Sequence, residues 1–239
     1  MSTSDPAELA CHRIEGAGPA VVFLPGYASD MSGTKAVALE DWAKANGRAF
    51  VRFDYRGCGE SPGAFEDFTL ADWRDDVLAM LDTIEGPVVL AGSSMGGWLM
   101  LLAALARPGK VAGLVGIAPA PDFTDWGFTD AQKHAFIKAG RVLEDSLYSD
   151  QPTVTTRGFW EAGQRLHVLD GAIAYDGPVR IVQGQADRDV PWDLAPRIAG
   201  ALRSADVQTW LVKDGDHRLS RPGDIVLIIR AVEDVLACS

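Results

Sequence analysis

The sequence is poor in cysteine and has neither a long apolar run nor an excess of positive charge. Its three cysteines, among 239 residues, are scattered, and none belongs to a C-x-x-C pair. That usage is typical of a reducing compartment and of a protein without a structural zinc site. The longest apolar run, residues 98–106, is far too short to cross a bilayer. The first residues show no basic segment followed by an apolar one. These absences predict a cytoplasmic protein with no membrane span and no secretory signal.

Acidic side chains outnumber basic ones. The 22 basic and 33 acidic residues give a formal net charge of −11 at pH 7, which argues against nucleic acid or an anionic membrane as a partner. A composition with 47% hydrophobic and 23% charged residues is that of an ordinary globular protein. A chain of 239 residues has the usual length of one domain with a sizeable core. We therefore expect residues 1–239 to form a single domain.

Short apolar runs alternate with segments of helical spacing over most of the chain. A strand with a poor pattern is expected at residues 9–15, on an edge of the sheet. Strands that alternate with helices indicate a mostly parallel central sheet with right-handed crossovers and helices on both faces. The sequence therefore predicts an α/β fold. Clearer, buried strands are predicted at residues 20–24, 49–53, 87–91, 111–117, 178–182 and 207–212.

The best-marked helix starts at Thr69. Asp72 stands three residues later, as in a capping box, and Phe68 and Trp73 occupy the two positions of a hydrophobic staple. Gly86 is expected to close this helix.

The alternation stops between about residues 122 and 177, where aromatic side chains stand among many polar ones. Parts of this segment have helical spacing. Because it precedes the penultimate predicted strand, we expect a short helical cap inserted over the edge of the sheet where parallel strands end and ligands bind. Its aromatic side chains are expected either to line an apolar acyl pocket or to form a small core of the cap itself.

Residues 92–96 read G-S-S-M-G, directly after a predicted strand and directly before an apolar helix. A serine on such a tight strand-to-helix turn is a nucleophile elbow. The turn holds the Ser94 hydroxyl clear of the sheet, and a Cβ at Gly92 or Gly96 would clash with neighbouring backbone. A turn of small residues that only packs a helix on a sheet is the structural alternative.

A serine hydroxyl is a poor nucleophile unless a base takes its proton, and the base needs an orienting acid. Asp187 lies in the loop after the strand at 178–182, and His217 lies in the loop after the strand at 207–212. This order along the chain, each residue after a strand, is the one that accompanies a nucleophile elbow. The predicted catalytic residues are therefore Ser94, Asp187 and His217, with no metal and no cofactor.

Two other aspartates stay open as the acid. Asp189 lies just before Val190 and Pro191, where shaping the loop is the simpler role. Asp122 follows the strand at 111–117, a position that this type of fold also uses.

Acyl transfer also needs hydrogen-bond donors for the oxygen that becomes negative. The backbone N–H of Met95, at the start of the helix, is one predicted donor. The backbone N–H of Tyr27, in the loop after the first strong strand, is the other. The Tyr27 side chain is expected to pack against the pocket wall, which is compatible with that role.

The segments FDYRGCGES, LAGSSMGGW, GQADRDVPW and DGDHR together resemble the α/β-hydrolases. The run GSSMGGWLMLLAALARP, with the VPW turn, is similar to one branch of that superfamily. This branch holds the mitochondrial acyl-protein thioesterase that also cleaves acyl glucuronides, together with bacterial serine hydrolases. The resemblance covers roughly residues 21–121 and 178–217 and is weak across the insertion. It implies an α/β-hydrolase fold with Ser94 as nucleophile, Asp187 as acid, His217 as base, and Tyr27 and Met95 as oxyanion donors. The chain begins without a transit peptide, so the resemblance does not extend to a mitochondrial location.

These observations predict a cofactor-free serine hydrolase that cleaves the carboxylic esters or thioesters of small molecules or acylated proteins. An aminopeptidase or amidase on the same fold stays open and would need an acidic site for the free amine of its substrate. A non-catalytic ligand-binding protein usually lacks one member of the triad, and here none is missing. Neither the acyl length nor the leaving group nor the oligomeric state is predicted.

Overall fold

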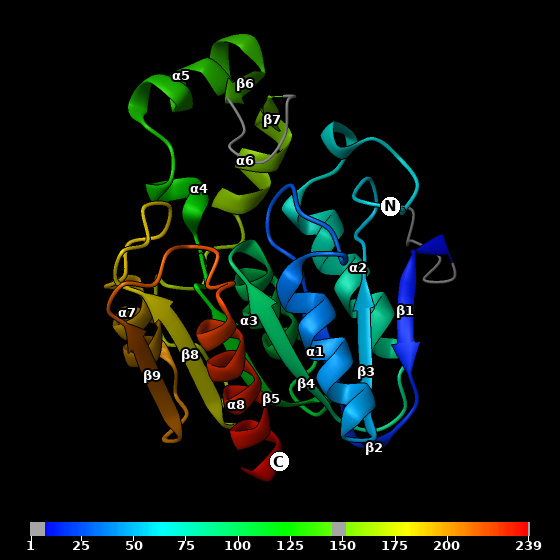
Figure 1. Cartoon of the computed structure of the whole chain (residues 1–239). Coiled ribbons are helices and arrows are strands. Elements are labelled where there is room, and N and C mark those ends of the chain that lie inside the picture. The colour runs from blue at the N-terminus through cyan, green and yellow to red at the C-terminus, as the bar shows by residue number, and fades with distance from the viewer. Residues whose placement is uncertain (1–7, 145–151, 239) are drawn as a thin grey trace.

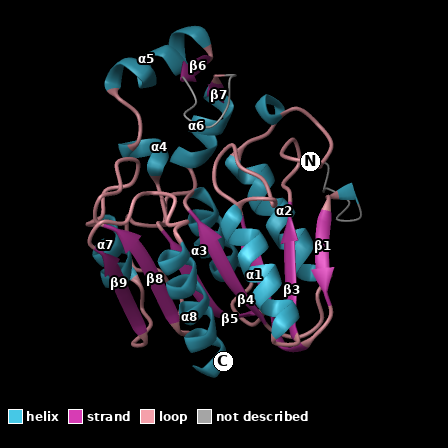
Figure 2. Ribbon diagram, in the orientation of Figure 1, coloured by secondary structure: helices cyan, strands magenta, loops and turns pink. Residues whose placement is uncertain are grey.

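The computed structural model describes residues 8–144 and 152–238. Within them, a seven-stranded sheet has the order β1-β3-β2-β4-β5-β8-β9. Its strands lie side by side below a separate group of helices (Figures 1 and 2). Strand β1 is antiparallel to β3, and all other neighbours in this sheet are parallel, as predicted. The strands are β1 (Cys11–Ile14), β2 (Ala17–Leu24), β3 (Arg48–Phe53), β4 (Val88–Ser93), β5 (Val111–Ile117), β8 (Val179–Gly184) and β9 (Val207–Val212).

Helices cover both faces of the sheet (Figure 1). Two of them pack on one face, around a core that includes Val21 and Phe50. Three pack on the other face, around a larger core that includes Leu90 and Trp98. The first pair is α1 (Thr34–Ala45) and α8 (Pro222–Cys238), and the second group is α2 (Leu70–Asp82), α3 (Met95–Ala106) and α7 (Leu194–Ala201).

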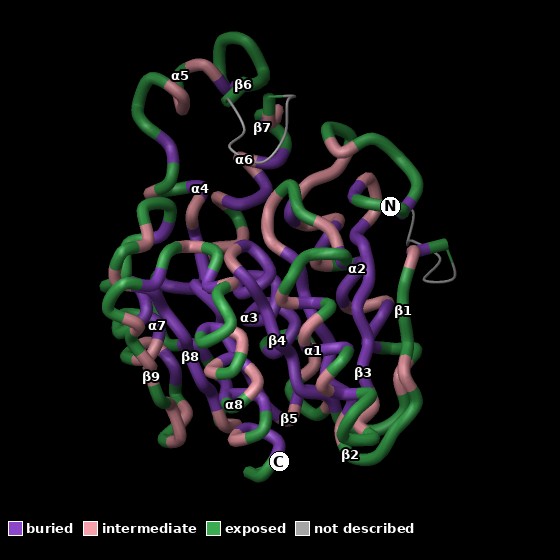
Figure 3. Tube along the Cα trace, viewed as in Figure 1, coloured by how far each residue is buried: buried purple, intermediate pink, exposed green. Residues whose placement is uncertain are grey.

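The middle of the sheet is the most buried part of the molecule (Figure 3). Every residue of β4 is buried, and so is most of α3 behind it. A parallel strand that is covered on both faces needs apolar side chains at successive positions, which explains the unbroken run Val88–Ala91. The turn between β4 and α3 is therefore held on both sides by packed, rigid elements.

The start of α2 follows the prediction. The Thr69 side chain accepts from the backbone N–H of Asp72, and the Asp72 carboxylate accepts from the backbone N–H of Thr69, which completes a capping box. The end differs, because α2 stops at Asp82 and Gly86 lies beyond it with a positive φ of 69°. The C-cap residue, Thr83, turns its hydroxyl back onto the carbonyl of Met80, 2.7 Å away. A hydroxyl that bonds the backbone within the last turn competes with continuation of the helix.

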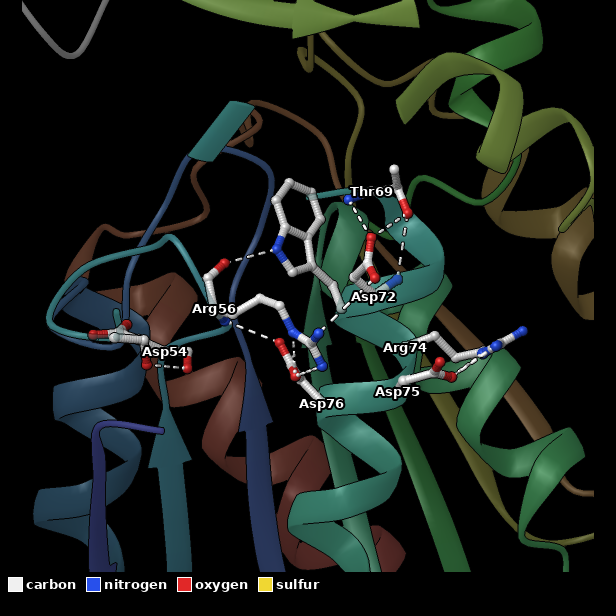
Figure 4. A network of polar contacts seen from close by, with 9 residues as sticks. Asp54, Arg56, Thr69, Asp72, Arg74, Asp75 and Asp76 are labelled. Carbon is white, nitrogen blue, oxygen red and sulfur yellow. Dashed lines mark hydrogen bonds and ion pairs between the residues drawn. The ribbon is translucent and has the colours of Figure 1, made fainter. Parts of the chain in front are cut away.

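A buried ion pair fixes the loop after β3 onto α2 (Figure 4). The Arg56 guanidinium donates to the fully buried carboxylate of Asp76, at 2.6 and 2.8 Å. The backbone carbonyl of Arg56 accepts from the Trp73 indole at 3.0 Å, and the guanidinium lies over the Phe68 ring. Charge-assisted bonds of this kind fix a geometry more firmly than neutral ones. The loop after β3 is therefore held in one position beside the segment that follows β2.

The segment between β5 and β8 lies over the edge of the sheet at which the parallel strands end (Figure 1). Its described residues contain three helices, in line with the helical spacing predicted for parts of the segment, and also a two-stranded antiparallel hairpin that was not predicted. The predicted insertion, residues 122–177, includes 145–151, which lie outside the described residues. The elements are α4 (Phe123–Trp126), α5 (Asp130–Ala139), β6 (Arg141–Glu144), β7 (Thr153–Thr156) and α6 (Arg157–Gln164).

A short 3₁₀ helix, Phe65–Asp67, completes the upper part of the molecule. Nowhere in residues 8–144 and 152–238 is there a helix with the length and apolar character that crossing a bilayer requires.

Candidate active site

Ser94 occupies the turn between β4 and α3 in a backbone conformation that few residues adopt. Its φ is 54° and its ψ is −119°, a strained combination of the kind that clusters at functional sites. Three backbone hydrogen bonds hold it there. The N–H of Ser94 donates to the carbonyl of Ile117, and its own carbonyl accepts from Gly97 and Ala120, all at 2.9 to 3.0 Å. The hydroxyl is thereby presented at the end of the central strand.

The glycines on either side of Ser94 are required by backbone contacts. A Cβ on Gly92 would lie 2.3 Å from the carbonyl oxygen of Gly96, and a Cβ on Gly96 would lie 2.1 Å from the carbonyl oxygen of Leu24. The predicted clash is therefore present at both positions. The absence of a Cβ at Gly96 also lets the end of β2, and the loop that follows β2, lie against the turn that carries Ser94.

The structure brings Ser94, His217 and Asp187 together. The Nε2 atom of His217 lies 3.1 Å from the Ser94 Oγ, and the Nδ1 atom lies 2.9 Å from the Oδ2 of Asp187. Ser94 is 123 residues from His217 along the chain. Nucleophile, base and acid thus lie in one hydrogen-bonded row, the geometry that such a triad needs.

Two glycines allow the acid loop and the histidine loop to meet. A Cβ on Gly184, the last residue of β8, would lie 2.2 Å from the carbonyl oxygen of Gly215. The Ala186 N–H donates to that same carbonyl at 3.0 Å, and the Gln185 N–H donates to Val212 at 2.8 Å. The relative position of Asp187 and His217 is therefore set by main-chain contacts between neighbouring strand ends.

The Asp187 carboxylate is completely buried, and every bond to it favours the ionised form. One oxygen accepts from the backbone N–H groups of Asp189 and Val190, both at 2.9 Å, and the other from His217 and from the Gln183 amide at 3.0 Å. Burial alone would raise the pKa of Asp187, but the bond and charge of His217 and the two backbone donors outweigh it and lower the pKa. The lowered pKa stabilises the folded chain above the ordinary pKa of aspartate, and this contribution is lost as the pH falls through the lowered value.

Gln183 is a site residue that the sequence analysis missed. It is fully buried in β8, and its Nε2 donates to the Asp187 carboxylate. The signal was an amide directly after the strand predicted at 178–182, four residues before the predicted acid. A buried polar side chain needs a partner, so this position could have been predicted to support the acid.

Neither alternative acid has a hydrogen bond between its carboxylate and His217 among the described residues. Asp189 donates its backbone N–H to Asp187 and thus shapes the loop. Asp122 is buried, and its carboxylate accepts from the backbone N–H groups of Val168 and Leu169 at 2.9 and 2.8 Å. Burial raises the pKa of Asp122 more than these two bonds lower it. Asp122 therefore anchors the loop after α6 and has no hydrogen bond to His217 among the described residues.

Asp187, Asp189 and His217 each offer a ligand atom within 4.8 Å of the others. A metal ion bound by all three would need either the Nδ1 atom of His217 or the Nε2 atom. The first faces Asp187 and the second faces Ser94. Metal binding and the hydrogen-bonded row therefore compete for the same atoms.

The loop after β2 places Tyr27 next to the nucleophile. A Cβ on Gly26 would lie 3.3 Å from the Cβ of Ser94, so the chain at residue 26 passes close to the serine. Met95 is the first residue of α3, where a helix leaves its N–H groups without intrahelical acceptors. Within the part of the chain that the structure describes, the N–H groups of Tyr27 and Met95 have no hydrogen-bond acceptor.

A cavity of about 780 Å³ opens beside Ser94, beneath the segment between β5 and β8. Its volume falls within the usual range for small-molecule sites. Carboxylates, Arg188 and a stretch of β7 also border it. The aromatic side chains in its wall are Tyr27, Phe65, Phe123, Trp126 and Phe128.

Both roles predicted for the aromatic residues of the insertion occur. Phe123 and Trp126 line the cavity. Phe136 stacks on Trp160, with ring centroids 5.6 Å apart, and packs with Phe128 in a small core of the segment itself. The part of the insertion that lines the cavity is therefore stabilised by a small core within the insertion itself.

A smaller cavity, of about 250 Å³, lies on the other side of Ser94 and shares Tyr27, Ala28, Ser94 and His217 with the larger one. Lys35 lines the smaller cavity, and burial and the charge of Arg218 lower the pKa of Lys35 to about 8. The polar side chains that line only the smaller cavity are Ser29, Asp30, Thr34, Lys35, Arg218 and Ser220, together with the neighbouring Ser93.

Comparison with known proteins gives one family. The model of a family described as "Alpha/beta hydrolase family" matches residues 21–227. The mitochondrial palmitoyl-protein thioesterase ABHD10 of Mus musculus is 39% identical over 241 residues, which covers 99% of this chain and 81% of that protein. The Homo sapiens protein of the same name is 38% identical over 242 residues, covering 99% of this chain and 79% of that protein.

Structural comparison agrees. The solved structure of alpha/beta hydrolase domain-containing protein 10 from mouse superposes with a TM-score of 0.89 at 39% identity, covering 96% of this chain and 94% of that one. The relatives are named as mitochondrial proteins, whereas cytoplasmic location remains a prediction for this chain.

Proposed function

Because this chain belongs to the alpha/beta hydrolase family, we propose that it is a serine hydrolase that cleaves carboxylic esters or thioesters through an acyl-enzyme. The observation that carries the proposal is the hydrogen-bonded row of Ser94, His217 and Asp187 beside a cavity of about 780 Å³. The thioesterase names of the relatives support the same bond type. In this proposal Ser94 is the nucleophile, His217 the base and Asp187 the acid.

In the acylation step, the Nε2 of His217 takes the proton of Ser94 while the Oγ attacks the acyl carbon. The electron pair of the carbonyl moves onto its oxygen, which accepts hydrogen bonds from the N–H groups of Tyr27 and Met95. When the intermediate collapses, the C–O or C–S bond breaks and the leaving alcohol or thiol takes the proton from His217. Asp187 keeps the imidazole oriented and stabilises its positive charge.

In the deacylation step, water takes the place of the leaving group. His217 removes one proton from the water as its oxygen attacks the acyl carbon. The bond to the Ser94 Oγ then breaks, the serine regains its proton from His217, and a carboxylic acid leaves. The cycle needs no metal and no cofactor.

The two cavities divide naturally between the two parts of the substrate. We assign the acyl chain to the larger cavity, because its wall contains five aromatic rings, and the leaving group to the smaller one, which also reaches Ser94 and His217. The segment between β5 and β8 then serves as a cap over the acyl chain. The relatives named palmitoyl-protein thioesterases support a long acyl chain and a thiol leaving group, on an acylated protein or a small molecule.

An aminopeptidase would need a carboxylate free to bind the amine of its substrate. Glu66 and Glu144 line the larger cavity, but Arg141 lies 3.8 Å from the first and the Gln132 amide donates to the second at 2.8 Å. Both glutamates already have partners, which favours an ester or thioester over an N-terminal amide; Asp189 is the remaining carboxylate in the wall of this cavity.

Asp187→Asn is expected to lower kcat by about 10³- to 10⁴-fold and to lower stability by about 1–3 kcal/mol, because the buried Gln183 amide loses its acceptor. The Asn amide would donate to Nδ1 of His217 and thereby favour the tautomer that carries its proton on Nε2, which cannot accept the proton of Ser94. Steady-state kinetics on one p-nitrophenyl ester measures the effect.

Asp122→Asn is the matched control, because it removes the same charge from the other candidate acid. It is expected to keep kcat within about 3-fold while lowering stability by about 1–3 kcal/mol, since one backbone N–H loses its acceptor. If Asp122→Asn were the inactive variant of the two, the assignment of the acid would be wrong.

The substrate class is tested by initial rates on p-nitrophenyl esters and acyl thioesters with chains from two to sixteen carbons. We expect rates that peak at one chain length, with thioesters among the accepted substrates. Turnover of aminoacyl amides in preference to every ester would contradict the proposal. No turnover of any member, together with no labelling by a fluorophosphonate, would support a ligand-binding protein instead.

A further inference from the structure

The Tyr27 side chain connects the main chain next to the nucleophile with the hairpin of the cap. Tyr27 follows β2 in the loop that passes close to Ser94 at Gly26. Its hydroxyl lies 2.9 Å from the Oγ1 of Thr155, which is fully buried on β7 and lies 128 residues away in the sequence. One side chain thus spans from the proposed oxyanion donor to the cap.

Four aromatic rings enclose the Tyr27 ring, and each comes from a different element. The ring centroids lie 5.1 Å from Phe65 in the 3₁₀ helix and 6.1 Å from Trp73 in α2. They lie 5.8 Å from Phe123 in α4 and 4.8 Å from Phe159 in α6. Such pairs contribute beyond their buried area, so the ring is held in place on all these sides.

The hydrogen bond between the Tyr27 hydroxyl and Thr155 further restricts the orientation of the Tyr27 ring. Burial raises the pKa of the Tyr27 hydroxyl above its ordinary value, so the group stays protonated and keeps its hydrogen bond. The residue that follows, Ala28, has a φ of 51°. The chain therefore turns sharply directly after Tyr27, and a shift of the ring is transmitted to the short backbone segment that carries the Tyr27 N–H.

The acyl site lies between the two ends of this connection. Tyr27 and Thr155 both line the larger cavity, together with Thr153 and Val154 of the same strand. An acyl chain in that cavity therefore contacts both the hairpin and the side chain that holds the oxyanion donor.

We propose that Tyr27 is a positioning residue whose hydroxyl bond to Thr155 fixes the oxyanion N–H relative to the cap hairpin. The inference rests on the proposed function and extends it, because the cap then acts on the reacting centre and not only on acyl binding. The bond acts through the position of the amide, so its loss lowers kcat and leaves KM nearly unchanged.

The experiment compares Tyr27→Phe, Thr155→Val and the double variant on the best thioester of the chain-length series, with active sites counted by fluorophosphonate titration. Each single variant is expected to lower kcat by about 10-fold, less than the loss of an oxyanion donor, with KM within about 2-fold. The double variant is expected to match a single one, because both substitutions remove one bond. Thr155→Ser restores the hydroxyl and should regain most of kcat.

Tyr175→Phe is the control, because it removes the hydroxyl of a buried tyrosine that lines neither cavity and whose hydroxyl donates to the Val111 carbonyl at 3.4 Å. It should keep the wild-type kcat. The proposal would be overturned by an unchanged kcat per titrated site in Tyr27→Phe, or by losses of kcat that multiply in the double variant. If turnover still depended on Ser94, the proposed function would stand in either case. Absence of wild-type turnover on every ester and thioester would overturn both.

Discussion

Replacing Ser94 with alanine is expected to lower kcat for ester and thioester hydrolysis by roughly 10⁴- to 10⁶-fold. The substitution removes the oxygen that lies 3.1 Å from His217 and that forms the acyl-enzyme in the proposed mechanism. Oxyanion donors and the acyl cavity stay in place, so slow water attack on bound substrate accounts for the residual rate. Initial rates for wild type and variant on the same thioester measure the effect.

The variant should remain folded, because within residues 8–144 and 152–238 the serine hydroxyl is bonded only to His217, and alanine meets the same backbone strain at a φ of 54°. Its melting temperature is expected to stay within about 3 °C of wild type, since only one net hydrogen bond is lost. Ser93→Ala is the matched control at the neighbouring position, in β4, and should keep most of the activity. Wild-type turnover by the Ser94 variant would exclude the mechanism.

Gly184→Ala is expected to be the most destabilising of the substitutions discussed, by about 3 kcal/mol. The new Cβ would lie 2.2 Å from the carbonyl oxygen of Gly215. Gly184 and Gly215 lie where the main chains of the two loops approach each other, and this approach aligns Asp187 with His217. For a chain of this size, the melting temperature should fall by roughly 6–12 °C. The activity that remains per folded molecule should also fall, since the two loops must separate.

Gly200→Ala is the control for this prediction. Gly200 lies in α7, and a Cβ there meets no atom within 4 Å. Alanine in place of a helical glycine is expected to raise the stability by about 0.5–1 kcal/mol. If Gly184→Ala melted at the wild-type temperature, the close backbone crossing of the two loops would be wrong.

The strands, and the meeting of Ser94, Asp187 and His217 in one hydrogen-bonded row, were predictable from the sequence because both depend on local patterns. Buried parallel strands require continuous apolar runs, so all six strong strands lie where the runs are. The elbow and the loops with Asp187 and His217 follow directly from those strand ends. The capping box at Thr69 is equally local.

The parts that escaped prediction depend on distant contacts or on weak local signals. The hairpin of β6 and β7 consists of two four-residue strands, largely polar, which give little periodicity. Gly86 was a plausible helix end, but a hydroxyl in the last turn ends α2 earlier. The bond between Tyr27 and Thr155 spans 128 residues, so no local pattern predicts it.

The predicted role of Asp187 over Asp122 illustrates the limit of position alone. Both aspartates follow parallel strands near the same edge, and both are shielded from solvent. Only their hydrogen-bond partners distinguish them, because one faces His217 and the other faces two backbone N–H groups. These partners come from the insertion and from the last strand loop, far from either aspartate in sequence.

The central claim is that Ser94 carries the acyl group during turnover. Rapid acid quench of the wild-type protein with a slowly hydrolysed acyl thioester, followed by peptide mapping by mass spectrometry, tests it directly. The account predicts one acyl adduct per chain, on Ser94, and none in Ser94→Ala. An acyl adduct on another residue would contradict this claim. Steady turnover by wild-type protein that forms no acyl adduct, and that a fluorophosphonate labels at a residue other than Ser94, would also contradict it.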